Sequence, residues 1–166
     1  MNSSFFIENS KNEGTRKINL QIIKESNTAL LIVDVQNKLM PTIRNQTNLI
    51  KQILRLIKAF KLLSIKLFYT EQNPSRLGKT VDQIREELDI SAFTKMSFSC
   101  CNNLNLLSEL EKAKIKTIVI CGIESHICIL QTSIELLRKG FTVVVAVDAI
   151  NSRNEIDHET ALVRLS

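Results

Sequence analysis

The sequence predicts a single α/β domain, built on a mostly parallel sheet with helices on both faces. Its 166 residues suit one hydrophobic core better than two. With 44% hydrophobic and 23% charged residues, its composition is that of an ordinary globular protein. Short apolar runs alternate along the chain with segments of helical length, which is the pattern of βαβ units with right-handed crossovers.

The first half of the domain contains two predicted strands around one long helix. Residues 28–33 form an apolar run rich in branched side chains that ends at Asp34, as in a strand buried on both faces. Apolar residues recur at helical spacing over 48–63, with lysine and arginine largely on the opposite face. A second strand is predicted over 65–70, and proline and glycine mark a loop at 71–78.

The remaining predicted elements continue this alternation. Helices are predicted where leucine and isoleucine recur at helical spacing, and strands where branched residues run together. A basic last turn followed by Gly140 marks the end of one helix. In chain order the elements are a weak helix at 81–88, a brief strand-like piece at 92–94, a helix at 103–114, a strand at 117–121, a helix at 127–137, a strand at 141–147 and an acidic helix start at 155–158.

The chain is expected to divide into a lead segment and one folded domain. Residues 1–27 form the lead, which is expected to be partly flexible, with Ile18 to Ile23 packing on the sheet. Residues 28–166 form the domain. No uninterrupted apolar run reaches ten residues, which excludes a spanning helix and a standard secretory signal. We therefore expect a cytoplasmic protein without a membrane partner.

Charge and cysteine content narrow the partners further. The chain has 22 lysine and arginine residues against 17 aspartate and glutamate residues, a net charge of +5 without a block of like charges. Nucleic acid is therefore not expected as a partner, and the basic face of the helix at 48–63 is interpreted as a solvated surface. The four cysteines include no CxxC pair and only two histidines accompany them, so no zinc site is expected and a reducing interior is favoured.

Three predicted strand ends supply candidate catalytic side chains, because ligands of parallel sheets bind beyond the carboxyl ends of the strands. Cys128 follows a sharp turn at Gly122, where a helix N-terminus favours a thiolate. Asp34 closes the first strand and can take the thiol proton, while Lys95 can hold Asp34 ionised and stabilise charge on a substrate. Each has an alternative role, which is a packed small hydrophobe for Cys128, a helix cap for Asp34 and a surface residue for Lys95.

Other catalytic motifs are absent or unsuited. His126 lies two residues from Cys128, and residues so spaced on a helix do not face each other, so His126 is interpreted as a pocket wall or a satisfied polar residue. The four glycines form neither GxGxxG nor a Walker loop, so no nucleotide cofactor is expected. GxSxG is also absent, which sets aside a serine-hydrolase elbow.

Three segments of the chain carry motifs that are specific in combination. They are Thr28-Ala-Leu-Leu-Ile-Val-Asp34-Val-Gln36, Phe93-Thr-Lys95-Met-Ser-Phe98-Ser and Gly122-Ile-Glu-Ser-His-Ile-Cys128-Ile-Leu-Gln131-Thr. In order and spacing they resemble the isochorismatase-like cysteine hydrolase superfamily. The loop Asn151-Ser-Arg153 is similar to the superfamily's loop after a late strand, so the resemblance covers residue 28 to the C-terminus.

The resemblance implies a three-layer αβα, Rossmann-like fold and a catalytic triad of Asp34, Lys95 and Cys128. In that scheme Asp34 is the general base for Cys128, and Lys95 supports the ionised pair. The thiolate attacks a carbonyl carbon, an amine leaves, and water hydrolyses the resulting thioester. No cofactor takes part.

The resemblance also implies features of the turn that carries the nucleophile. A non-proline cis peptide is expected at Ile123-Glu124, in the turn before Cys128. The backbone N–H groups of Glu124 and Cys128 are expected to form an oxyanion hole. The expected substrate pocket includes Gln36, Phe98 and His126.

Departures from the superfamily's patterns point to the substrate class. Nicotinamidases carry an Asp and His metal cluster after the second strand, whereas this chain has Thr70-Glu-Gln-Asn-Pro74 there, so no metal is expected. Isochorismatases that hydrolyse a vinyl ether lack the nucleophilic cysteine, so Cys128 argues for hydrolysis of a C–N bond in a small amide-like metabolite. Residues 70–74 and 77–80 look most like isochorismatase-domain proteins whose physiological substrates are unassigned. A vinyl-ether hydrolase and a catalytically idle interaction protein stay open as alternatives.

The end of the chain bears on its assembly. Superfamily members usually add one more strand and helix beyond the position of Ser166, so this domain lacks them. An edge strand would then be left unpaired, and unpaired edges invite association. The expected partners are therefore a small-molecule substrate and other copies of this chain in a homo-oligomer.

Overall fold

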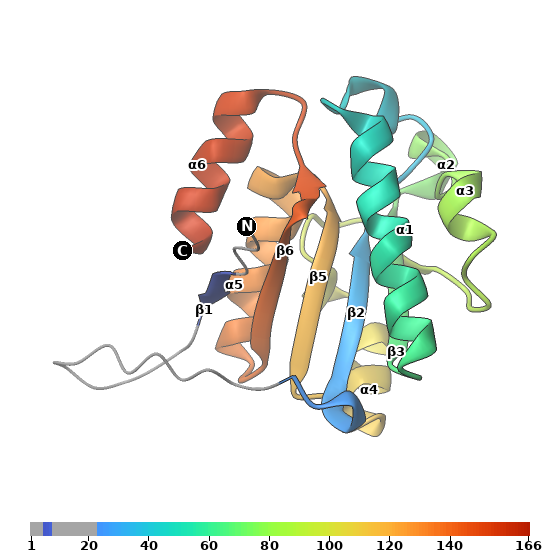
Figure 1. Cartoon of the computed structure of the whole chain (residues 1–166), viewed down its shortest axis with the longest axis vertical. Helices are drawn as coiled ribbons and strands as arrows, with labels where there is room; N and C mark the ends of the chain where they lie inside the picture. Colours follow the sequence, from blue (N-terminus) through green and yellow to red (C-terminus); the bar gives the residue numbers. More distant parts are fainter. Residues whose placement is uncertain (1–4, 8–22) are drawn as a thin grey trace, which may run out of the picture.

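The computed structural model describes residues 5–7 and 23–166. The expected packing of Ile18 to Ile23 on the sheet lies outside these residues, apart from Ile23 itself. The described strands form one sheet in the order β1-β6-β5-β2-β3-β4, in which β1 is antiparallel and the other five are parallel (Figure 1). Their bounds are Phe5–Ile7 (β1), Thr28–Val33 (β2), Lys66–Gln72 (β3), Phe93–Lys95 (β4), Thr117–Ile123 (β5) and Thr142–Asn151 (β6).

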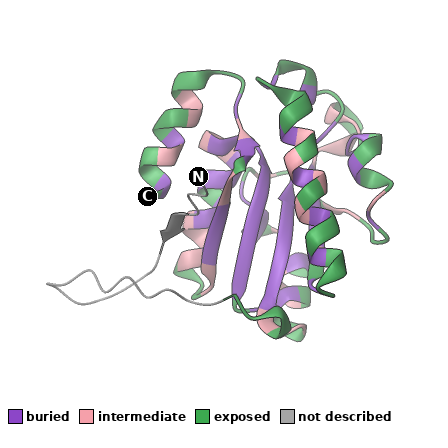
Figure 2. Cartoon of the chain, viewed as in Figure 1, coloured by how far each residue is buried: buried purple, intermediate pink, exposed green. Residues whose placement is uncertain are grey.

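Helices cover both faces of this sheet, which confirms the predicted three-layer α/β fold. One face packs against α1 and α3 through a core that includes Ile53 and Ile84, and the other packs against α4, α5 and α6 through a core that includes Leu110 and Leu136. The central strands are buried throughout, while the outer faces of the helices are exposed (Figure 2). The helices are α1 (Gln46–Leu62), α2 (Pro74–Leu77), α3 (Asp82–Arg85), α4 (Leu104–Lys112), α5 (Leu130–Arg138) and α6 (Glu155–Leu165). None in the described part of the chain is long and apolar enough to cross a membrane.

Strands β3 and β6 are longer than their apolar runs predicted. β3 continues to Gln72 because its last residues pair with β4. β6 continues to Asn151, past the exposed Asp148, because a register shift lets Ile150 pair with Gly122 after the regular ladder ends. The predicted end of this strand at Val147 was therefore wrong, since pairing with a neighbour can carry a strand through a polar residue at a bulge.

The outer edge of β6 carries a strand from the lead segment. Phe5–Ile7 (β1) pairs antiparallel with Val143 to Val145. The sequence predicted an unpaired edge strand, and in the described part of the chain residues 5–7 cover part of the outer edge of β6. The homo-oligomer therefore stays a prediction. The argument from an unpaired edge supports it less, because part of the β6 edge is paired with β1.

The centre of the sheet brings two strand ends together at Gly122. β2 pairs with β3 on one side and β5 on the other, so Val33 lies opposite both Thr70 and Gly122. Gly122 has a φ of 116°, and a Cβ placed on it would lie 2.2 Å from the carbonyl oxygen of Val33. Only glycine accepts this conformation and this approach. The residues that follow β2 and β5 are consequently held side by side.

Candidate active site

Asp34 is the first residue after β2, and its carboxylate is completely buried. Its φ of 52° is in the left-handed region, which turns the chain sharply at the strand end. The Thr70 hydroxyl donates to Asp34 Oδ1 at 2.8 Å, and the Lys95 ammonium donates to Oδ2 at 2.5 Å. Both carboxylate oxygens thus have a fixed partner, as burial of a charge requires.

Lys95 ends β4, and its side chain is 1% exposed. Its Nζ also donates to the carbonyl oxygens of Ser97 at 3.1 Å and Phe98 at 2.9 Å, and lies 3.9 Å from Cys128 Sγ. Burial lowers the pKa of Lys95, but the Asp34 charge and the nearby thiols outweigh it, so the net effect is a raised pKa. Lys95 is therefore a permanent cation between the carboxylate and the thiol.

Cys128 is the third side chain of this cluster, after Asp34 and Lys95. It lies in the π-helical turn Ser125–Ile129, which precedes α5. Its residue is 5% exposed. Burial raises the pKa of the Cys128 thiol, as do the Asp34 charge and a hydrogen bond to Asp34, while Lys95 lowers it without reversing the result. The expected preference for a thiolate was wrong, because burial and the Asp34 charge both disfavour an anion at Cys128.

Glu124 heads the turn that carries Cys128. The Ile123–Glu124 peptide bond, where a cis peptide is expected, is cis. The Glu124 carbonyl accepts hydrogen bonds from the backbone N–H groups of Ile127 at 3.1 Å and Ile129 at 3.2 Å. These two residues flank Cys128, so the position of Glu124 fixes the backbone on both sides of this cysteine.

The rim of the site is formed by the loop after β6 and the start of α6. Arg153 binds the Glu124 carboxylate, with Nη2 to Oε1 at 2.7 Å and Nε to Oε2 at 3.1 Å. Burial raises the pKa of Glu124, but the hydrogen bonds and charge of Arg153 outweigh it and hold that pKa below its usual value. Glu124 is therefore an ionised, buried carboxylate that Arg153 binds as its cationic partner.

Comparison with known proteins decides the family. The family model of the Isochorismatase domain matches residues 28–166. The chain is 36% identical over 138 residues to Isochorismatase domain-containing protein 2 of Danio rerio, covering 83% of this chain and 70% of that protein. This chain belongs to the isochorismatase family. The resemblance seen in its three motifs is thereby confirmed.

Solved structures of the isochorismatase family and its fold share this architecture. A structure described as MAR1 ribonuclease from Caenorhabditis elegans superposes with a TM-score of 0.80 and 36% identity, over 86% of this chain and 74% of that one. The nicotinamidase SaPncA from Staphylococcus aureus superposes with a TM-score of 0.71 and 21% identity, over 83% and 92% of the two chains. The second likeness shows a common fold.

The expected pocket residues differ in their roles. Gln36 is fully buried, and its amide donates to the carbonyl oxygens of Gln72 at 3.0 Å and Gly78 at 2.6 Å. We correct its assignment, since this side chain fastens the loop after β3 and has no surface left for a substrate. Phe98 is 50% exposed beside Lys95, and His126 is partly exposed with Nδ1 2.9 Å from the Ser152 hydroxyl. Both remain predicted pocket residues.

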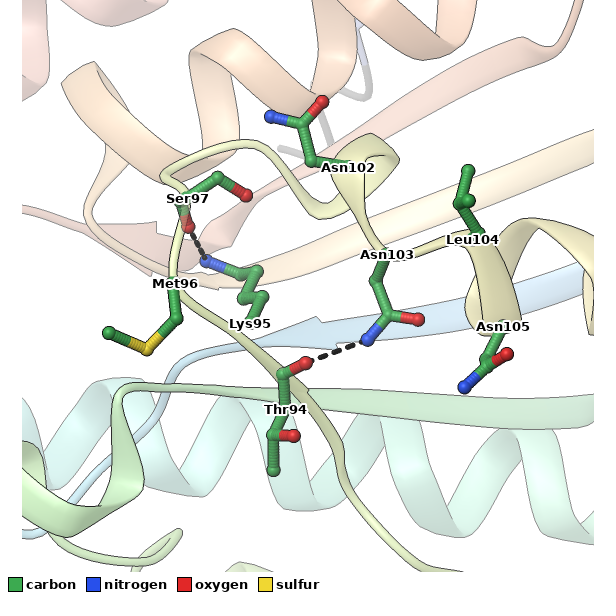
Figure 3. A pocket seen from close by; sticks show the side chains of 8 residues that line it. All are labelled: Thr94, Lys95, Met96, Ser97, Asn102, Asn103, Leu104 and Asn105. Atoms are coloured by element: carbon green, nitrogen blue, oxygen red, sulfur yellow. Dashed lines mark hydrogen bonds between the residues drawn. The ribbon is translucent and has the colours of Figure 1, made fainter.

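A pocket of about 300 Å³ lies at the end of β4 (Figure 3). In Figure 3 the Lys95 ammonium donates a hydrogen bond to the Ser97 carbonyl, and the Asn103 amide donates one to the Thr94 carbonyl. The lining of this pocket does not include Asp34 or Cys128. The residues around it are Thr94, Lys95, Met96, Ser97, Asn102, Asn103, Leu104 and Asn105.

Thr70 and Cys100 belong to the site but were not predicted. Thr70 supports Asp34, and its hydroxyl lies 3.7 Å from Cys100 Sγ. Burial, together with the Asp34 charge, raises the pKa of Cys100 to about 12, so this second thiol is protonated at neutral pH, as that of Cys128 is. The available signal was that the strand predicted over 65–70 ends at Thr70, as the strand predicted over 28–33 ends at Asp34. Among the described residues, no group of three or more His, Cys, Asp or Glu side chains is arranged to hold a metal ion.

Proposed function

We propose that this chain is a metal-independent cysteine hydrolase that cleaves the C–N bond of a small amide through a thioester. The observation that carries the proposal is the meeting of a carboxylate, an ammonium and a thiol in one buried site. This is the arrangement of a nucleophile with an adjacent base that a third group holds in place. Membership of the isochorismatase family, whose members are generally hydrolases, supports it.

Each proton in the proposed reaction has a named carrier. Asp34 takes the proton of the Cys128 thiol as Sγ attacks the carbonyl carbon, and the oxyanion is stabilised by the backbone N–H groups of Glu124 and Cys128. Asp34 returns this proton to the nitrogen, the C–N bond breaks, and ammonia or an amine leaves. Asp34 then accepts a proton from water as that water attacks the thioester. The tetrahedral intermediate then collapses, the C–S bond breaks, and Asp34 returns its proton to Cys128 Sγ, so that release of the acid restores the thiol and the Asp34 carboxylate.

The resting thiol is consistent with this role of Asp34. Because its pKa is raised, the Cys128 thiol keeps its proton at rest and loses it only when it attacks the substrate, to the neighbouring Asp34 carboxylate. Lys95 keeps its positive charge and stabilises whichever of the two groups is anionic. The burial of Cys128 favours a small substrate.

A test of this proposal uses an activated ester together with a panel of small primary amides. We expect p-nitrophenyl acetate to acetylate Cys128, seen by peptide mass spectrometry, and the wild-type protein to release ammonia from amides. The Cys128→Ser variant should lose both reactions. The Cys101→Ser variant is the matched control, because it removes a buried thiol that faces the Thr132 carbonyl and is not part of the proposed triad, and it should keep both.

Two outcomes would contradict the proposal. If Cys128 is acetylated no faster than Cys100, the chain is a catalytically idle member of the family. The similar protein from Caenorhabditis elegans is described as a ribonuclease, which makes RNA a second candidate substrate. RNA cleavage that disappears in Cys128→Ser, with no acetylation of the thiol, would favour that function instead.

A further inference from the structure

Residues 124–129, the nucleophile turn, begin with three consecutive side chains that each bind either the segment joining β6 to α6 or the first turn of α6. Glu124 binds Arg153, as described above. The Ser125 hydroxyl lies 2.9 Å from His158 Nδ1, and His126 Nδ1 lies 2.9 Å from the Ser152 hydroxyl. Residues 152–158 therefore hold the start of the nucleophile turn at three points, from a part of the chain about thirty residues later.

The Glu124 contact is the strongest of the three. Arg153 supplies side-chain bonds from Nε and Nη2 together with a backbone bond, from its N–H to Glu124 Oε2 at 3.1 Å. The Glu124 side chain is 6% exposed, while that of Arg153 is 49% exposed. Two-point binding by a guanidinium fixes orientation as well as distance. Arg153 thus aligns Glu124 and is not itself one of the groups that react.

We propose that Arg153 is a positioning residue, which acts through Glu124 to hold the backbone N–H groups of the oxyanion hole in place. The Glu124 carbonyl binds the N–H groups on both sides of Cys128, so a shift of Glu124 moves this part of the backbone. The inference rests on the proposed function, because it assigns a role within the same thioester chemistry.

Two reactions of Cys128 separate this role from a merely structural one. Acetylation by p-nitrophenyl acetate passes through a tetrahedral oxyanion, which the N–H groups stabilise. Alkylation by iodoacetamide displaces iodide at a saturated carbon and forms no such oxyanion. A loss of oxyanion-hole geometry therefore lowers the acetylation rate more than the alkylation rate, whereas general loosening of the fold changes the two rates together.

The test compares Arg153→Gln with a matched control, Arg44→Gln. Arg44 also forms an ion pair at this rim, at 2.9 Å from Glu155, but that pair does not touch the nucleophile turn. We expect Arg153→Gln to lower the ratio of acetylation to alkylation by about tenfold to a hundredfold, as small misplacements of reacting groups do. Arg153→Lys keeps the charge without the two-point geometry, so its ratio should be intermediate.

The outcomes distinguish failure of this inference from failure of the proposed function. If Cys128 is acetylated in the wild type and the ratio is the same in Arg153→Gln as in Arg44→Gln, the positioning role is wrong and the proposed function stands. A parallel fall of both rates in Arg153→Gln also overturns the positioning role. If the wild-type thiol is not acetylated, the proposed function itself fails.

Discussion

Two carboxylates lie near Cys128 and each is bound to a cation, but the two pairs differ in their access to water. The side chains of Asp34 and Lys95 are 0% and 1% exposed, whereas those of Glu124 and Arg153 are 6% and 49% exposed. In the first pair both charges have lost their hydration, and each depends on the other. In the second pair the cation keeps half of its surface in water.

This difference suits the first pair to the proposed proton transfer and the second pair to anchoring the backbone. A fully buried ion pair contributes little net stability to the fold, because the cost of desolvation offsets the attraction. Removing one member nevertheless leaves the other as an unpaired buried charge. A fully buried pair suits a site in which one of the two charged groups takes up and returns a proton. A pair with a hydrated cation is easier to maintain and suits the positioning of backbone. Four predictions test this contrast, beginning with the largest expected effect.

Removal of the buried cation should have the largest effect on stability. In Lys95→Met the Asp34 carboxylate stays buried without its cation, and we expect a loss of about 3–5 kcal/mol in the free energy of unfolding. Urea denaturation measures it. Lys61→Met, which breaks the exposed pair with Asp89, should cost less than about 1 kcal/mol. The double variant Asp34→Asn with Lys95→Met should regain stability over Lys95→Met, and a further loss would contradict the contrast.

Removal of the buried carboxylate should change the chemistry of the thiol. Because the Asp34 charge raises the pKa of Cys128, Asp34→Asn should move the pH profile of iodoacetamide alkylation to lower pH. On the rising part of the profile, each unit of displacement increases the rate about tenfold. Amide hydrolysis should fall by about 10²–10⁴-fold, because the proton carrier is lost. Glu135→Gln, which alters a carboxylate bound to Ser99, is the control, and an unmoved profile in Asp34→Asn would count against the assignment.

The anchoring carboxylate should contribute less to stability, and in a pH-dependent way. Glu124→Gln weakens the charge-assisted bonds to Arg153, and we expect a loss of about 1–3 kcal/mol at neutral pH. The folded-state pKa of Glu124 is lowered, so its contribution is present above the unfolded value of about 4.3 and is lost as the pH falls through the folded value. Urea unfolding of both proteins at several pH values measures this difference. If the difference in unfolding free energy between the wild type and Glu124→Gln persists at pH values well below the folded-state pKa of Glu124, packing and not charge explains the effect.

The smallest effect is expected at His158, which belongs to the anchoring side. Burial lowers its pKa, so the unfolded chain binds the proton more readily than the folded one. Its stabilising contribution is therefore present above the unfolded pKa of about 6.5 and declines as the pH falls through the lower, folded value. His158→Asn should flatten the dependence of the melting temperature on pH over this range. An unchanged slope would remove His158 from the pH response.

The fold followed from local patterns, and so did three residues that the structure brings together. Apolar runs indicated where β2 and β5 lie, and the three residues are Asp34 directly after β2, Lys95 at the end of β4 and Cys128 in the turn after β5. Parallel pairing places such residues at one edge, so their meeting could be expected without knowledge of distances. Their catalytic roles stay proposals.

The sign of the Cys128 pKa and the role of Arg153 could not be read from local pattern. The pKa depends on burial and on Asp34, which is 94 positions away in the chain, whereas the sequence argument considered only the adjacent helix terminus. Arg153 was noticed only as part of a loop, because its partner Glu124 lies 29 residues earlier. Gln36 was misassigned for the same reason, since its amide binds residues 36 and 42 positions further along.

The close approach of Gly122 to Val33 has a consequence for how this family can diverge. The strand ends that carry Asp34 and lead to Cys128 meet through main-chain atoms, with no side chain between them. Their separation is therefore determined by backbone geometry and not by the volumes of neighbouring hydrophobic residues. Leucine, isoleucine and valine on either side of the sheet can be exchanged over evolutionary time while the spacing of the reacting groups stays constant.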